Sequence, residues 1–282
     1  MNRPIDAWLH TIDHPGKRLR MGRLLRPETG RGVIVAMDHG LFVGRPEGLE
    51  EVGRTIDRLL PAGPDGVLVT PGMLRHVAGR LAGRGGPGVV LALDTYLTTT
   101  FPGKGGLAGA GSGQAHRSIA SPEQAAALGA DCVKLLLIFG DAGLPAFADN
   151  LSFIAQTVEA SRRTGVPVMV EPTVWSYPGV PAPALSATQL ADMARIAVEL
   201  GADILKLPFA GPLDEFRSIV RESPVPVMVL GGARTQTPEA TLEMARQATE
   251  AGAAGLVFGR NVWQHPDPPG LLRQLLQVVH GA

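Results

Sequence analysis

The chain has 282 residues, of which 45% are hydrophobic and 18% are charged, and this composition predicts a folded protein with a sizeable core and excludes a disordered chain. Lysine plus arginine equals aspartate plus glutamate at 26 each, so a net charge of zero gives no electrostatic basis for binding nucleic acid or an anionic membrane. The single cysteine, Cys132, lies in an apolar run and excludes a disulfide within the chain, which is typical of the reducing cytoplasm.

Residues 1–28 differ from the rest of the chain because they are rich in arginine. We expect them to form a short N-terminal helical extension, followed by one domain over residues 29–282. The extension lacks the apolar core and the cleavage site of a signal peptide, and no uninterrupted apolar stretch approaches the ~20 residues of a membrane span. The sequence therefore predicts a cytoplasmic protein with no membrane partner.

Eight apolar runs rich in β-branched residues follow in chain order. They show no polar alternation, which is typical of parallel strands covered on both faces. The runs are residues 32–37, 66–70, 88–93, 131–139, 166–170, 203–207, 225–230 and 255–258. Segments with helical spacing of apolar residues lie between most of them, at 49–60, 73–81, 147–164, 188–200, 213–222 and 239–251.

Eight strand–helix units in about 250 residues predict an α/β fold, the (β/α)8 or TIM barrel. Several helix starts carry capping signals, such as the capping boxes that begin at Ser121 and Ser186 and the proline that follows Thr237. A doubly wound sheet is the alternative fold, but no Gly-x-Gly-x-x-Gly follows the first strand, as that fold requires for a dinucleotide. A glycine-rich segment at 101–114 follows the third strand, and we expect either an unstructured loop or a mobile active-site loop.

Two lysines occur in matching six-residue motifs of the form Gly-Ala-Asp-x-x-Lys. They are Lys134 on the fourth predicted strand and Lys206 on the sixth. Burial disfavours an ammonium group and lowers its pKa, and an amine that is partly neutral near pH 7 is what Schiff-base chemistry needs. For a single lysine the alternative is a structural role at a strand end, with the ammonium group in water. Two lysines in matching motifs favour a catalytic role instead.

Barrel active sites collect where the strands end, and two carboxylates are predicted there. Asp38 follows the first strand and Glu171 the fifth, so both can exchange protons around a Schiff base or neutralise the two lysines. His39 adjoins Asp38, but neighbouring strand residues point to opposite faces, so we predict a structural role for it.

The last two strands end in residues suited to a phosphate group. Gly231 and Gly232 follow the seventh strand, and Gly259 and Arg260 follow the eighth. Loops at these two positions form the usual phosphate site of barrels, where backbone N–H groups and an arginine hold a dianion. Tight turns are the alternative role of the glycines. The seven histidines form no metal-binding pattern, so we expect neither a metal nor an organic cofactor.

Several motifs together resemble the DhnA-type class I aldolases, a superfamily that includes the archaeal-type fructose-bisphosphate aldolases. They are Val35-Ala36-Met37-Asp38-His39-Gly40, Lys206, Gly231-Gly232 and Val257-Phe258-Gly259-Arg260-Asn261-Val262-Trp263-Gln264. The resemblance spans roughly residues 18–280. It implies a (β/α)8 barrel that makes or cleaves C–C bonds through an iminium on Lys206, with Asp38 handling protons. It also implies a phosphorylated keto-sugar or ketone as substrate, and a homo-oligomer.

One departure from the family pattern bears on the substrate. The archaeal-type aldolases have a catalytic tyrosine near the end of strand 4, where this chain reads Leu136-Leu137-Ile138-Phe139-Gly140. Lys134 and Glu171 are instead similar to the pattern of tagatose-bisphosphate and sulfofructose-phosphate aldolases. The departure argues against fructose-bisphosphate as substrate and against the amino-dideoxy-heptulosonate synthases. Two alternatives to an aldolase remain, an acyl-transferring thiolase of the phosphonooxypentanedione type and a barrel that only binds sugar phosphate.

Overall fold

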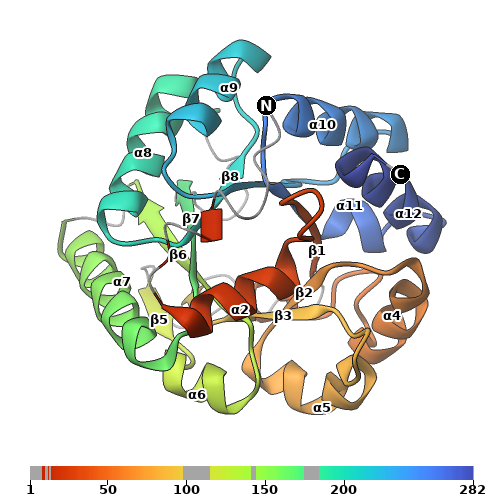
Figure 1. The fold of residues 1–282 in the computed structure, drawn as a ribbon, viewed down its shortest axis with the longest axis horizontal. Helices are drawn as coiled ribbons and strands as arrows, with labels where there is room; N and C mark the ends of the chain where they lie inside the picture. The colour runs from red at the N-terminus through yellow and green to blue at the C-terminus, as the bar shows by residue number, and fades with distance from the viewer. Residues whose placement is uncertain are drawn as a thin grey trace.

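Eight parallel strands close into a barrel in a computed structural model that describes residues 8–9, 12, 14–97, 115–140, 144–174 and 184–281 (Figure 1). Each barrel strand pairs with the barrel strand that follows it in the chain, and the last pairs with the first. The strands are β1 (Gly32–Ala36), β2 (Gly66–Val69), β3 (Gly88–Ala92), β6 (Cys132–Phe139), β7 (Val168–Val174), β8 (Ile204–Pro208), β9 (Val227–Leu230) and β10 (Gly255–Phe258). The predicted (β/α)8 barrel is confirmed, and the glycine-rich segment 101–114 lies outside the described residues.

Helices surround the barrel, and they pack on the outward-facing residues of the strands. The predicted capping boxes at Ser121 and Ser186 are both present. The longer helices are α4 (Val52–Leu59), α5 (Pro71–Leu81), α6 (Pro122–Ala127), α7 (Leu144–Thr164), α8 (Ala187–Glu199), α9 (Leu213–Glu222), α10 (Pro238–Glu250) and α12 (Pro268–His280). The short turns are α3 (Gly40–Val43), the 3-10 turn η1 (Leu60–Ala62) and α11 (Arg260–Trp263).

Two features at the C-terminal rim differ from the sequence-based expectation. A two-stranded antiparallel sheet, β4 (Asp94–Leu97) with β5 (Ala115–Ser118), stands directly after β3. The fifth barrel strand also continues past Glu171 to Val174, whereas we expected it to end at Glu171-Pro172. It continues because β6 and β7 pair over seven successive positions, so a longer partner supports the strand beyond its proline.

The interior of the barrel holds its own apolar cluster, separate from the layer under the helices. Alternate strand residues point inward, and those near the N-terminal ends fill the lumen. They include Ile34, Leu68, Val90, Cys132, Met169, Ile204 and Met228, all buried. Cys132 is fully buried and burial raises the pKa of its thiol, which agrees with the predicted core role.

The N-terminal extension closes one end of this interior. Its helix α2 (Pro15–Leu24) lies across the ring of strands in Figure 1, and Met21, Leu24 and Leu25 belong to the interior cluster. The approach is close because β2 and β3 begin with glycine: a Cβ on Gly66 or Gly88 would lie 3.0 Å or 2.7 Å from the Leu24 side chain. The predicted helical extension is therefore present, and it seals the N-terminal face of the barrel.

Three aspartates fasten α2 and the turn after it to the barrel. Each receives a hydrogen bond from a backbone N–H at the start of a neighbouring strand segment, and each also pairs with a basic residue of the extension. The pairs are Lys17 with Asp203, Arg23 with Asp131 and Arg26 with Asp65, at 2.7, 2.9 and 2.6 Å. The N–H donors are those of Val168, Val89 and Val33. The three aspartates thus accept hydrogen bonds from backbone N–H groups that α2 would otherwise bury without partners.

Among the residues that the structure describes, we find no helix with both the length and the apolar character of a membrane span.

Leu24→Ala should lower the free energy of unfolding by about 2–5 kcal/mol, because it opens a cavity between α2 and the starts of β2 and β3. Leu24 is fully buried, whereas Leu19 of the same helix is 73% exposed. Leu19→Ala is the matched control and should change the stability by less than about 0.5 kcal/mol. Urea denaturation of both variants gives the comparison, and equal losses would contradict the sealing role of α2.

Candidate active site

Four residues predicted from separate strands meet at the C-terminal end of the barrel interior. Lys134 of β6, Glu171 of β7 and Lys206 of β8 are inward-facing, and Asp38 follows β1. Both lysine Nζ atoms contact the same oxygen, Glu171 Oε2, at 2.8 Å for Lys134 and 2.9 Å for Lys206. The Lys134 Nζ also lies 3.8 Å from Asp38 Oδ2. The site thus pairs two ammonium groups with two carboxylates.

The two lysines differ in burial. The side chain of Lys134 is 2% exposed and that of Lys206 is 8% exposed. Lys134 lies deeper, as expected from its place earlier in a longer strand. Lys206 precedes Leu207 and Pro208 at the end of β8, so its amine is nearer the open rim.

The charges set the ionisation of the cluster. Burial alone would lower the pKa of Lys134, but the charges of Glu171, Asp38 and Asp94 together outweigh it and raise the pKa above its usual value. Burial would raise the pKa of Glu171, but Lys134 and Lys206 lower it to about 2. The expectation that burial leaves both amines partly neutral is therefore wrong for Lys134, because three carboxylates surround that amine.

An apolar wall stands beside these charges. Leu136 and Ile138 follow Lys134 at alternate positions of β6, and they pack with Phe42 of α3. The Phe42 ring centroid lies 5.9 Å from the Lys134 Nζ, within the range of a cation–π contact. This wall occupies the segment where the archaeal-type pattern has a tyrosine.

His39 lies at the site, contrary to the prediction that it points away from Asp38. Strand β1 ends at Ala36, so the alternation of faces stops before His39 is reached. Its Nδ1 lies 3.5 Å from Asp38 Oδ1, and its ring packs edge-on against Trp263 with centroids 5.4 Å apart. Burial lowers the pKa of this imidazole, so the neutral form is favoured.

The loops after β9 and β10 adjoin each other as the sequence predicted. Arg260 Nη2 donates to the Gly232 carbonyl at 2.8 Å, and Asn261 Nδ2 donates to the Gly231 carbonyl at 2.8 Å. Gly259 requires its small size, because a Cβ there would lie 2.6 Å from His39 Cε1. The four predicted phosphate-site residues therefore form one surface at the rim, and phosphate binding itself stays a prediction.

Sequence reasoning missed two polar residues at the same rim. Neither Asp94 nor His116 is among the residues predicted for the site. In the structure, His116 Nε2 lies 2.8 Å from Asp94 Oδ2, and Asp94 is fully buried. No local pattern marks the pair, because 22 residues separate its members and they meet only through the β4–β5 pairing.

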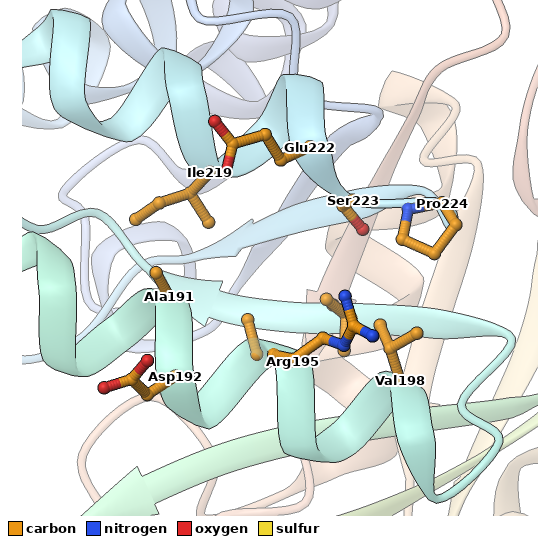
Figure 2. Close-up of a pocket in the computed structure, with 10 residues that line it drawn as sticks. Ala191, Asp192, Arg195, Val198, Ile219, Glu222, Ser223 and Pro224 are labelled. Carbon is orange, nitrogen blue, oxygen red and sulfur yellow. The ribbon is translucent and has the colours of Figure 1, made fainter.

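A surface groove between α8 and α9 is separate from this site. Figure 2 shows Ala191 and Val198 of α8 on one side and Ile219 of α9 on the other. Leu205 of β8 also lines it, whereas Lys206, the next residue of the strand, points into the barrel. Within the described ranges, no three histidine, cysteine, aspartate or glutamate side chains gather as metal ligands.

Comparison with known proteins gives matches over nearly the whole chain. The family described as DeoC/LacD family aldolase matches residues 32–265. An uncharacterized aldolase of Saccharolobus solfataricus is 32% identical over 265 residues, which is 94% of each chain. A 2-amino-3,7-dideoxy-D-threo-hept-6-ulosonate synthase of Halobacterium salinarum is 31% identical over 94% of this chain and 92% of its own. The missing tyrosine therefore does not separate this chain from such synthases in overall sequence.

A solved structure shares the fold. It is an archaeal fructose-1,6-bisphosphate aldolase whose catalytic lysine is covalently bound to the carbinolamine intermediate of the substrate. The TM-score is 0.75 at 27% identity, over 93% of this chain and 99% of the other.

Glu171→Gln should destabilise the protein most near neutral pH. The carboxyl pKa falls from 4.5 to about 2 on folding, so its stabilisation is present above pH 4.5 and disappears as the pH falls through 2. The linkage amounts to roughly 3 kcal/mol. Urea unfolding of both proteins should therefore show a stability difference that shrinks between pH 4.5 and 2. Glu243→Gln, at an exposed position of α10, is the control and should show no such trend.

Proposed function

The chain belongs to the DeoC/LacD family of aldolases and is a class I aldolase, and on this premise we propose that Lys206 forms the iminium with a phosphorylated keto-sugar or related ketone phosphate. The observation that carries the proposal is the pair of buried lysines that share one glutamate oxygen at the catalytic face. An iminium withdraws electrons from the adjacent C–C bond, and no metal is needed for that step.

Lys206 is the better nucleophile of the two lysines. The attacking amine must be neutral, and Lys134 is held as an ammonium because burial is outweighed by the charges of Glu171, Asp38 and Asp94, which raise its pKa. Lys206 has Glu171 as its carboxylate contact and is the more exposed amine. The structure therefore supports a division of roles in which Lys134 remains charged, orients Glu171 and can bind a substrate oxygen.

The proposed proton carriers are Glu171 and Asp38. Glu171 Oε2 lies 2.9 Å from the Lys206 Nζ, so it is the nearest acceptor when the amine attacks the carbonyl. Its pKa of about 2 makes it a weak base while both lysines are charged. Loss of the Lys206 proton removes one of the charges that lower this pKa, so Glu171 becomes more basic as the carbinolamine forms. Asp38, on the other side of Lys134, is the second carboxylate.

The phosphate group of the substrate is proposed to bind between the last two barrel loops. Gly231, Gly232 and Gly259 allow close backbone approach, and Arg260 already reaches across to the Gly232 carbonyl. A guanidinium presents N–H donors in a planar fork, which is the geometry that suits a dianion. The Halobacterium relative and the archaeal structure are named for sugar chemistry, and the latter for a bisphosphate.

We also propose a homo-oligomer in the cytoplasm. The oligomer rests on the family resemblance, and the compartment rests on a single cysteine that is buried and cannot form an internal disulfide.

Borohydride reduction with dihydroxyacetone phosphate as the donor should label Lys206. Mass spectrometry should find one reduced donor unit on the peptide that contains it, and Lys206→Ala should abolish labelling. Lys134→Ala should leave labelling detectable but slow, because Lys134 is proposed only to orient Glu171 beside the reacting amine. Lys17, buried at the opposite end of the barrel, is an internal control and should stay unlabelled. Label on Lys134 with a reactive Lys206→Ala would reverse the two roles.

Arg260→Ala should raise the KM for phosphorylated donors about 10- to 150-fold, because a charged hydrogen bond contributes ~1.5–3 kcal/mol. Unphosphorylated dihydroxyacetone should lose far less, and steady-state kinetics with both donors tests the difference. Equal losses for both donors would contradict the phosphate assignment. Arg273→Ala, on α12, is a control for the loss of an arginine elsewhere.

A further inference from the structure

A second polar pair stands at the catalytic rim, and the mechanism above uses only the charge of its carboxylate. Asp94 opens β4 directly after β3, and its side chain is fully buried. Its Oδ2 accepts a hydrogen bond from the Leu136 N–H at 2.7 Å and lies 2.8 Å from His116 Nε2. A carboxylate that orients an imidazole through one ring nitrogen is the arrangement that supports general-base catalysis.

This pair adjoins the lysine site. Leu136, whose N–H donates to Asp94, follows Lys134 by two residues on β6, and the Leu93 N–H donates to the Lys134 carbonyl at 2.9 Å. Burial lowers the pKa of Lys134, and the charges of Glu171, Asp38 and Asp94 raise it, so Asp94 acts electrostatically on this amine. Asp94 therefore belongs to the same ring of inward-facing groups as the catalytic cluster.

One buried oxygen of the pair has no protein partner within the described residues. It is Asp94 Oδ1, in a residue that is 0% exposed. Leaving such an atom without a hydrogen bond is costly, so in native proteins it marks a place for a water or a ligand. A hydroxylated substrate supplies the missing donor.

The surroundings of His116 fix its orientation. The ring packs on Phe153 of α7 with centroids 5.0 Å apart, and the side chain is 11% exposed. The charged groups that contact it are Asp94 on β4 and Arg117 on β5, which donates to the His116 carbonyl at 2.7 Å. With Nε2 directed to Asp94, Nδ1 is the nitrogen that can exchange a proton with a substrate.

We propose that His116, oriented by Asp94, is the general base for the half of the substrate that leaves as an aldehyde. This inference rests on the proposed aldolase function. In cleavage, Nδ1 takes the proton of the hydroxyl next to the scissile bond, the O–H electron pair becomes the C=O bond, and the C–C pair moves to the iminium to give an enamine. In condensation, the imidazolium returns that proton to the aldehyde oxygen.

Glu171 is less suited to this step. Burial raises the pKa of Glu171, but its contacts with two lysines outweigh burial and lower the pKa to about 2. The Glu171 carboxylate is therefore a weak base. Glu171 therefore acts beside the amine, where it contacts Lys206, and a separate base takes the proton of the hydroxyl that becomes the aldehyde carbonyl.

The experiment separates the donor half-reaction from the aldol step. Wild type, His116→Ala, His116→Gln and Asp94→Asn are each trapped by borohydride with dihydroxyacetone phosphate alone. Each is then tested in condensation of that donor with a panel of short hydroxyaldehydes. His76→Ala, which removes an exposed histidine of α5, is the matched control. Thermal unfolding checks that each variant is folded.

We expect trapping of the His116 variants within about 2-fold of wild type, while kcat for condensation falls about 100-fold or more, with little change in the donor KM. Added imidazole should restore part of the activity of His116→Ala. His116→Gln should lose the alkaline limb of the kcat–pH profile for condensation, because the protonated imidazole is the form that donates in that direction. Asp94→Asn should lower kcat in the same direction.

Condensation by folded His116 variants at the wild-type rate, or a parallel loss of trapping and condensation without rescue by imidazole, would overturn the assignment. A wild-type protein that is not trapped by the donor contradicts the proposed function instead, so the two failures are distinguishable.

Discussion

The chemistry of this barrel depends on one carboxylate oxygen shared by two buried ammonium groups. Glu171 Oε2 contacts Lys134 and Lys206 at 2.8 and 2.9 Å, and either cation alone in the apolar lumen would be strongly unfavourable. The sharing is asymmetric, because Lys134 also has Asp38 and Asp94 near it. One lysine is thereby fixed as a cation, while the other contacts Glu171 and is the more exposed of the two. That asymmetry is the basis for proposing different roles for the two lysines.

The repeated Gly-Ala-Asp phrases link this site to the opposite end of the barrel. In each phrase the aspartate pairs with a basic residue of the N-terminal extension, and the lysine three residues later points into the catalytic end. Three strand residues span about 10 Å, which is the distance along the barrel between the aspartate that pairs with the extension and the lysine of the site. The same short sequence therefore anchors α2 below and positions an amine above. Because α2 covers the lower end, the two lysines are reached from the rim side within the part of the chain that the structure describes.

The rim combines groups of different character within a small space. On one side β6 contributes the apolar wall of Leu136 and Ile138, and on the other the last two loops contribute Arg260 and three glycines. The β4–β5 hairpin adds Asp94 and His116. Cationic, apolar and hydrogen-bonding groups therefore surround the two lysines at this rim.

The sequence by itself determined the eight strands, most of the helices and the placement of both lysines on strands, because apolar periodicity and helix caps are local signals. It also placed Asp38, Glu171 and the last two loops at the catalytic face, since strand order fixes that face in a barrel. Only the tertiary structure decided that Glu171 lies within β7, that it contacts both amines, and that the pKa of Lys134 rises. Those outcomes depend on distances between charges from strands far apart in sequence, and burial alone predicts the opposite direction. The pair of Asp94 and His116 was hidden for the same reason, because a hairpin joins residues that no short pattern connects.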